Sequence, residues 1–134
     1  VIEVGARSIG GLCARALRFG TGISLEELIL SHLLGLPIET MAREEEAAGV
    51  MMIPIPQAGV LRSVEGLAAA QAVAGVDDVA ITIPVGRDVV PLPEGNKYLG
   101  FIFARGDSPE AVEVALRDSH RCLRFRIDPG AEAE

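Results

Sequence analysis

The pattern of apolar and polar positions predicts a well-defined helix between residues 24 and 35. Ser24 and Glu27 have the spacing of a capping box, in which each side chain bonds the backbone N–H of the other residue. Gly35, followed by Pro37, predicts the end of the helix. Apolar residues surround much of this helix, so we expect it to be buried between two layers. Helical spacing of Leu12, Ala16 and Phe19 predicts a second, shorter helix around residues 11–18.

From residue 49 onward the pattern changes to short strands separated by turns. Strands are predicted at 50–55, 60–64, 79–83, 98–104 and 122–127, and helices at 66–74 and 108–120. The short gap after the first strand favours an antiparallel hairpin with the second, and the strongly apolar strand 98–104 is expected at the centre of its sheet. The order β-β-α-β-β-α-β predicts an α+β domain, with a mostly antiparallel sheet and two packed helices.

The two patterns suggest two parts and a tail. Residues 1–48 hold an apolar strand at 1–4, a glycine-rich loop and the capped helix, whereas residues 49–128 form the α+β domain. Residues 129–134 contain no large apolar side chain, and we expect them to be frayed. Because the first strand begins at residue 1 without an initiator Met, we expect the chain to be the C-terminal piece of a larger enzyme.

Composition narrows the function classes. The net charge of -7 argues against general nucleic-acid binding, which needs clustered Lys and Arg. No apolar run approaches the roughly 20 residues that span a bilayer, and no signal peptide is visible. With only 4% aromatic residues, the core must be built from Val, Ile, Leu and Ala. Cys13 and Cys122 fit no metal-ligand spacing, so we expect two buried free thiols in a cytoplasmic protein rather than a disulfide.

The candidate chemistry lies at the start of the chain. Glu3 and Arg7, on a strand followed by a turn, can point into one cleft. A carboxylate can bind Mg²⁺ together with phosphate oxygens, and an arginine can hold a phosphate with both arms of its guanidinium. Gly10 and Gly11 allow backbone N–H groups to approach an anion. A surface ion pair between Glu3 and Arg7 is the alternative interpretation of the same spacing.

Longer stretches resemble a known family. Residues 3–11, followed by an apolar segment and the capped helix, resemble the last part of an ATP-grasp domain. Residues 59–66 and 97–110 look like the C-terminal domain of ligases of the L-amino acid ligase type, often labelled biotin-carboxylase-like. The resemblance covers most of residues 1–128. In that family an acid, an Asn and an Arg close the site; here Gly5 stands at the Asn position, which removes one side-chain oxygen.

The resemblance implies a carboxylate–amine (or thiol) ligase that uses ATP and Mg²⁺ and passes through an acyl-phosphate. Glu3 would match the metal-bridging acid, and Arg7 the catalytic arginine on the transferred phosphate or carboxylate. The expected partners are upstream domains of the same polypeptide and small carboxylate and amine substrates, with a homodimer as a further option. Because the family's other metal and nucleotide ligands lie upstream, we expect residues 1–134 alone to bind no ATP tightly and to be inactive. The alternative is a non-catalytic module for interaction or small-molecule sensing.

Overall fold

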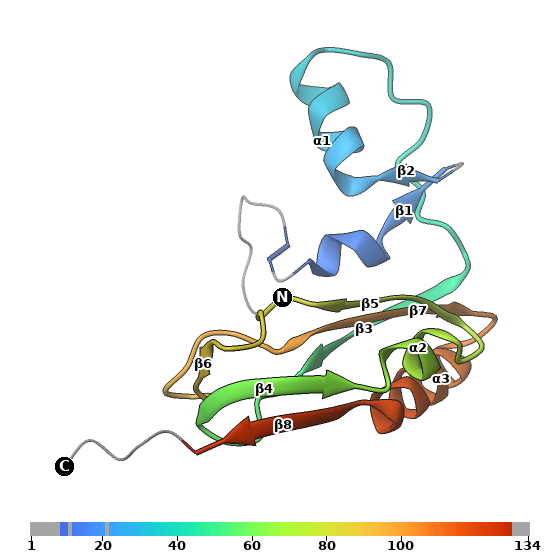
Figure 1. The fold of residues 1–134 in the computed structure, drawn as a ribbon. Coiled ribbons are helices and arrows are strands. Elements are labelled where there is room, and N and C mark those ends of the chain that lie inside the picture. The colour runs from blue at the N-terminus through green and yellow to red at the C-terminus, as the bar shows by residue number, and fades with distance from the viewer. Residues whose placement is uncertain (1–8, 11, 21, 130–134) are drawn as a thin grey trace. The chain divides into compact units, whose positions relative to one another are not determined.

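The computed structural model describes residues 9, 10, 12–20 and 22–129 and divides the chain into two compact units, Val1–Glu46 and Ala47–Glu134 (Figure 1). Within the described ranges, every helix is too short or too polar to cross a bilayer. The strand predicted at 1–4 lies outside the described residues, as does all of the predicted frayed tail except Pro129.

The first unit begins with a short helical turn and a small antiparallel ribbon. A 3₁₀ helix, η1 (Cys13–Ala16), is followed by β1 (Arg18–Phe19) and β2 (Ile23–Ser24). The prediction of a helix over 11–18 was therefore wrong in type and extent. Arg18 and Phe19 pair with Ser24 and Ile23 instead, and the backbone N–H of Glu44 bonds the carbonyl of Arg18 on the other edge of β1. These ladder bonds satisfy backbone groups that a longer helix would have used.

The capped helix α1 (Leu25–Leu33) forms as predicted. The backbone N–H of Glu27 donates to the Ser24 hydroxyl at 3.2 Å, and the Ser24 N–H donates to the Glu27 carboxylate at 2.8 Å. At the other end, Gly35 has a φ of 66° and its N–H bonds the His32 carbonyl, while the Leu36 N–H bonds the Ser31 carbonyl. This is a Schellman motif, so both ends of α1 are satisfied locally.

The burial predicted for α1 was wrong. None of its residues is buried, and the leucines near its C-terminal end are among the most exposed large apolar side chains of the described residues. The amphipathic pattern indicated a helix correctly, but burial depends on a second surface, which the described part of the chain does not supply.

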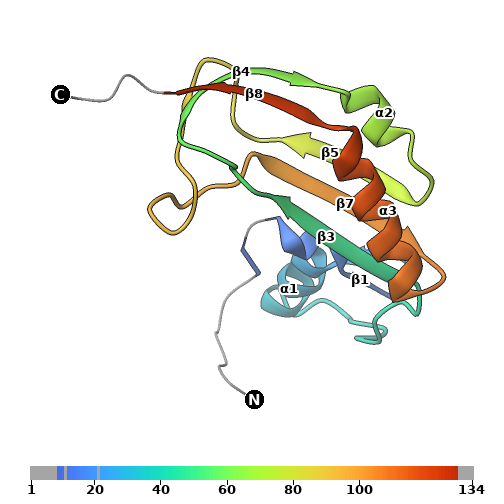
Figure 2. The ribbon, with the colours of Figure 1, turned by 90° about the horizontal axis from the view of Figure 1, so that it is seen from below.

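The second unit is an α+β domain with antiparallel pairing throughout its described strands, as the pattern predicted (Figure 2). Its elements are β3 (Ala47–Ile53), β4 (Gly59–Glu65), α2 (Leu67–Gln71), β5 (Val76–Ile81), β6 (Asp88–Val89), β7 (Gly100–Gly106), α3 (Pro109–Cys122) and β8 (Arg124–Asp128). One sheet has the order β3-β7-β5 and the other the order β6-β4-β8. The strongly apolar β7 is the central strand of its sheet, which confirms the sequence prediction.

The hairpin expected between the first two strands of this unit does not form. β3 pairs with β7, whereas β4 pairs with β6 and β8 in the other sheet. Pro54 and Pro56 lie in the connection and lack the N–H groups that a ladder needs. Between them, Ile55 is 7% exposed, so the connection passes through the core from one sheet to the other.

The two sheets and two helices of the second unit share one aliphatic core. Its fully buried cluster consists of Ile, Leu, Val and Ala side chains from both sheets and both helices, as the composition predicted. α3 packs on β3 and β7, and α2 packs on α3 (Figure 2). Gly49 of β3 permits this close approach, because a Cβ there would lie 2.7 Å from Val112 and 3.2 Å from Leu116. The domain is thus a packed scaffold built around α3.

Candidate functional site

The glycine segment at the start of the chain is the site that the sequence singled out. Of its four candidate residues, Glu3, Arg7 and Gly11 lie outside the described residues. Gly10 is described and lies in an exposed turn. The structure therefore gives no distance between the acid and the arginine, and their shared cleft stays a prediction.

The backbone beside Gly10 is open to an incoming group. A Cβ at Gly10 would meet no described atom within 4 Å, and its carbonyl accepts the Cys13 N–H at 3.3 Å. Two residues later, Leu12 adopts a left-handed φ of 59°, which costs a non-glycine residue roughly 1–2 kcal/mol. Neither packing nor a left-handed backbone requires glycine at position 10.

The titratable groups around α1 offer little chemistry of their own. The backbone N–H and hydroxyl of Ser24, with a smaller contribution from Arg18, hold the pKa of Glu27 below that of an ordinary glutamate. This carboxylate is committed to capping the helix. No group of three or more His, Cys, Asp or Glu side chains arranged to hold a metal occurs within residues 9, 10, 12–20 and 22–129. Cys122 is a free thiol as predicted, and both Cys13 and Cys122 are half-buried rather than buried.

Two glycines of the family-like stretch 59–66 have packing roles. A Cβ at Gly66, where φ is 80°, would lie 2.0 Å from the carbonyl oxygen of Cys122 at the end of α3. A Cβ at Gly59 would lie 2.0 Å from the carbonyl oxygen of Asp128 in β8. Both ends of β4 are thereby held against the C-terminal part of the domain, so these motif residues specify the scaffold rather than chemistry.

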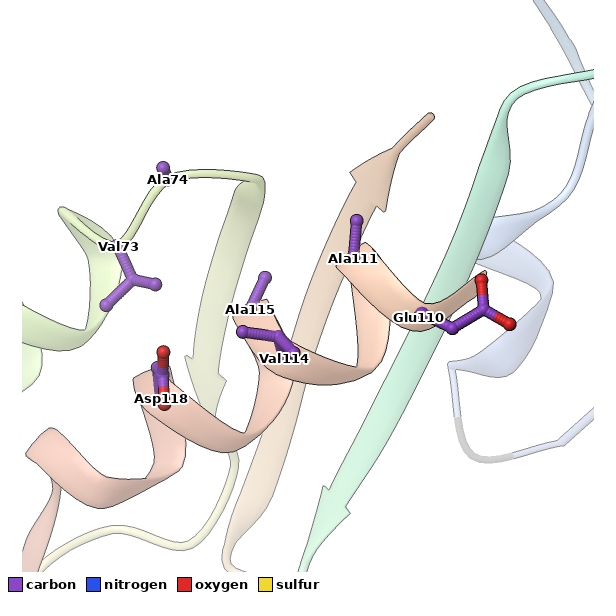
Figure 3. A pocket seen from close by; sticks show the side chains of 7 residues that line it. All are labelled: Val73, Ala74, Glu110, Ala111, Val114, Ala115 and Asp118. Atoms are coloured by element: carbon purple, nitrogen blue, oxygen red, sulfur yellow. The ribbon is translucent and has the colours of Figure 1, made fainter. Parts of the chain in front are cut away.

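The second unit also carries an open groove along α3, which the sequence did not indicate (Figure 3). It has a volume of about 550 Å³ and runs between the end of α2 and the exposed side of α3. Small apolar side chains form its floor and acidic ones flank it: Val73, Ala74, Ala111, Val114 and Ala115, with Glu110 and Asp118. Ala111 and Val114 form a second apolar stripe on α3, beside the stripe that faces the core. Their helical spacing was the sequence signal that could have indicated the groove.

Comparison with known proteins agrees with this fold. Residues 51–128 match the family model of the L-amino acid ligase C-terminal domain 2. The chain belongs to this family. The crystal structure of an L-amino acid ligase from Bacillus licheniformis superimposes with a TM-score of 0.77 and 28% identity, over 95% of this chain. A search of curated proteins gave no match.

Both comparisons support the resemblance to the C-terminal region of an ATP-grasp ligase. It spans about a third of the Bacillus protein, since the match covers 32% of that chain. The family model covers the core of the second unit, and the structural match extends over most of the first unit as well.

Proposed function

We propose that this chain is the C-terminal region of a cytoplasmic, ATP-dependent carboxylate–amine ligase, and that it supplies the last residues of the ligase's site. The observation that carries this proposal is the structural match of 95% of the chain to an L-amino acid ligase, because coverage that high reaches into the first unit as well as the second. When bound, ATP supplies the phosphoryl group and Mg²⁺ neutralises its charge. The rest of the phosphoryl-binding site would come from upstream parts of the polypeptide.

Each candidate residue has a defined task in this proposal. The Glu3 carboxylate would hold the metal, and the Arg7 guanidinium would bind the phosphoryl oxygens. Backbone N–H groups at Gly10 and Gly11 would bind the same anion, and no described atom crowds a Cβ position at Gly10. A carboxylate oxygen of the substrate would attack the terminal phosphorus of ATP and displace ADP. The amine nitrogen would then attack the acyl carbon, lose a proton and displace phosphate, which leaves an amide bond.

The test is made in the longer ligase polypeptide that contains this region. Arg7→Lys keeps the charge but loses the two-armed geometry, and Glu3→Gln keeps the shape but loses the charge. Each should lower ATP-dependent amide formation by about 100-fold or more, as removal of a charge-stabilising group does in other enzymes. The matched controls are Arg117→Lys and Glu113→Gln, an exposed ion pair on α3, which should leave the rate unchanged. Full activity of Arg7→Lys and Glu3→Gln would refute the assigned roles.

The isolated chain gives a second test. Without the upstream nucleotide ligands, residues 1–134 should show no micromolar binding of MgATP by titration calorimetry and no turnover. Tight binding would mean that the chain holds a nucleotide site of its own.

The groove along α3 favours one other candidate function, a non-catalytic interaction module. Under that hypothesis the second unit binds a partner through Ala111 and Val114, and the first unit is a linker. Val114→Asp would then abolish partner binding, whereas in the ligase hypothesis it leaves amide formation unchanged. Loss of partner binding in Val114→Asp would favour the interaction module, and loss of amide formation in Arg7→Lys would favour the ligase.

A further inference from the structure

The groove along α3 has an apolar centre that is open to solvent (Figure 3). Val114 is 58% exposed, and the exposed side chains of Ala74 and Ala111 are too small to fill the space beside it. Val73 and the buried Ala115 complete the lining of this centre. The centre of the groove can therefore accept apolar side chains from another molecule.

The surroundings of the groove distinguish it from a helix face that another layer of the same fold covers. Exposed charged side chains occur along α3 on both sides of Val114: Glu110, Glu113, Arg117 and Arg121. A face that is covered permanently is apolar over several turns, because a buried charge is costly unless it is paired. This side of α3 is therefore a solvated surface, on which a partner can bind reversibly.

Two carboxylates border the centre of the groove, one towards each end of α3. Glu110 lies in the first turn of α3 and makes no ion pair with a described residue. Asp118 accepts a hydrogen bond from Arg121 through Oδ1, and no described residue bonds its Oδ2. Eight residues of helix separate the two acids by roughly 12 Å. A ligand lying along α3 thus meets an acid, an apolar surface and a second acid in turn.

This arrangement selects the charge of the occupant. An anion, such as a nucleotide, would meet two like charges. A second copy that crosses α3 in the antiparallel direction, about a twofold axis at Val114, would place Glu110 of each copy near Asp118 of the other. A ligand with a positive charge at each end is attracted at both acids, and its apolar middle can fill the centre of the groove.

We infer that the groove along α3 binds an amphipathic helix of another polypeptide, with two basic side chains about two turns apart and apolar side chains between them. Helices that bind in grooves use anchors at positions i, i+3, i+4 and i+7. Lys or Arg at i and i+7 would reach Glu110 and Asp118, while the residues at i+3 and i+4 face Val114. The inference deepens the interaction-module hypothesis by naming the chemistry of its partner, and amide formation reports on the ligase hypothesis separately.

The test uses a fluorescent, alanine-rich helical peptide of about 18 residues, with Lys at i and i+7 and Leu at i+3 and i+4. Two matched peptides replace both leucines by Ser or both lysines by Glu. Binding to residues 1–134 and to the longer ligase polypeptide is measured by fluorescence anisotropy. The protein variants are Val114→Asn and Glu110→Lys. Glu113→Lys is the matched control, with the same charge change on the same helix but outside the groove lining.

We expect the Lys–Leu peptide to bind both polypeptides at least about tenfold more tightly than either matched peptide. Glu110→Lys and Val114→Asn should each weaken this binding about tenfold, whereas Glu113→Lys should weaken it by less than about threefold. Amide NMR shifts in residues 1–134 should change around 73–74 and 110–118, where the groove lies.

Three results would overturn the inference. Equal binding of the Lys–Leu and Lys–Ser peptides, or equal losses in Glu110→Lys and Glu113→Lys, would mean a general attraction to an acidic protein. Binding to residues 1–134 alone would mean that the groove is covered in the longer polypeptide. A dimer in analytical ultracentrifugation that Val114→Asn dissociates would make a second copy the occupant. The ligase function is tested apart from all three, because it fails only if the longer polypeptide forms no amide bond with ATP.

Discussion

Replacing Ser119 by alanine should destabilise the second unit through the loss of a single buried hydrogen bond. Ser119 lies on α3 with 0% exposure, and its hydroxyl donates to the carbonyl of Ala70 at 3.0 Å. Ala70 lies in the last turn of α2, where carbonyl groups have no partner within the helix. The Ser119 hydroxyl therefore supplies the hydrogen-bond donor for a carbonyl at the end of α2, on the side that α3 shields from water.

The size of the effect follows from this geometry. In Ser119→Ala the buried carbonyl of Ala70 keeps its place but loses its donor, which costs about 1–3 kcal/mol. The volume removed is that of one oxygen atom, so the cavity adds little, and alanine disturbs α3 less than any larger residue would. We expect a loss of about 2 kcal/mol in the free energy of unfolding. In a domain of this size that loss lowers the melting temperature by roughly 8–16 °C.

The assay is urea unfolding of wild-type and variant chains, followed by circular dichroism. Ser63→Ala is the matched control: the Ser63 hydroxyl bonds Glu65 at the solvent-accessible side of β4, so its loss should stay within about 0.5 kcal/mol. Equal midpoints for Ser119→Ala and Ser63→Ala would refute the reasoning, because the link between α2 and α3 would then contribute nothing measurable.

Two further predictions concern a glycine and a helix cap. Gly66→Ala should cost well over 2 kcal/mol in urea unfolding, because its Cβ would overlap the Cys122 carbonyl oxygen and its φ is left-handed. Gly86→Ala, with a φ of 90° but no described atom within 4 Å, should cost only the backbone strain of about 1 kcal/mol, and equal losses would contradict the overlap argument. The lowered pKa of Glu27 makes the α1 cap stabilising above the pKa of an unfolded glutamate, and this contribution is lost as the pH falls through the lower, folded pKa. Local amide exchange in α1 should therefore accelerate in acid, and Glu27→Gln should remove that pH dependence; an unchanged acid response in Glu27→Gln would count against the capping box as its source.

The sequence alone revealed the resemblance to a ligase family, because the residues that show it form local motifs. Gly59, Gly66 and the segment around Ser108 and Pro109 each mark a turn or a helix start, and such signals survive without knowledge of the tertiary fold. The structure explains the two glycines: at each end of β4 another backbone segment comes so close that a Cβ on the glycine would overlap it. The candidate site stays a prediction, because Glu3 and Arg7 lie outside the described residues.

By itself, the sequence determined the five longer strands of the second unit, the two longer helices, the aliphatic core and the central position of β7. These features depend on neighbours within a few residues, through periodicity, caps and turn residues. Only the tertiary structure decided that β3 and β4 belong to different sheets, that a groove lies along α3, and that the leucines near the C-terminal end of α1 are exposed in this chain. Strand pairing and burial depend on which distant surfaces meet, and a local pattern of apolar residues predicts that a surface will be covered without specifying what covers it.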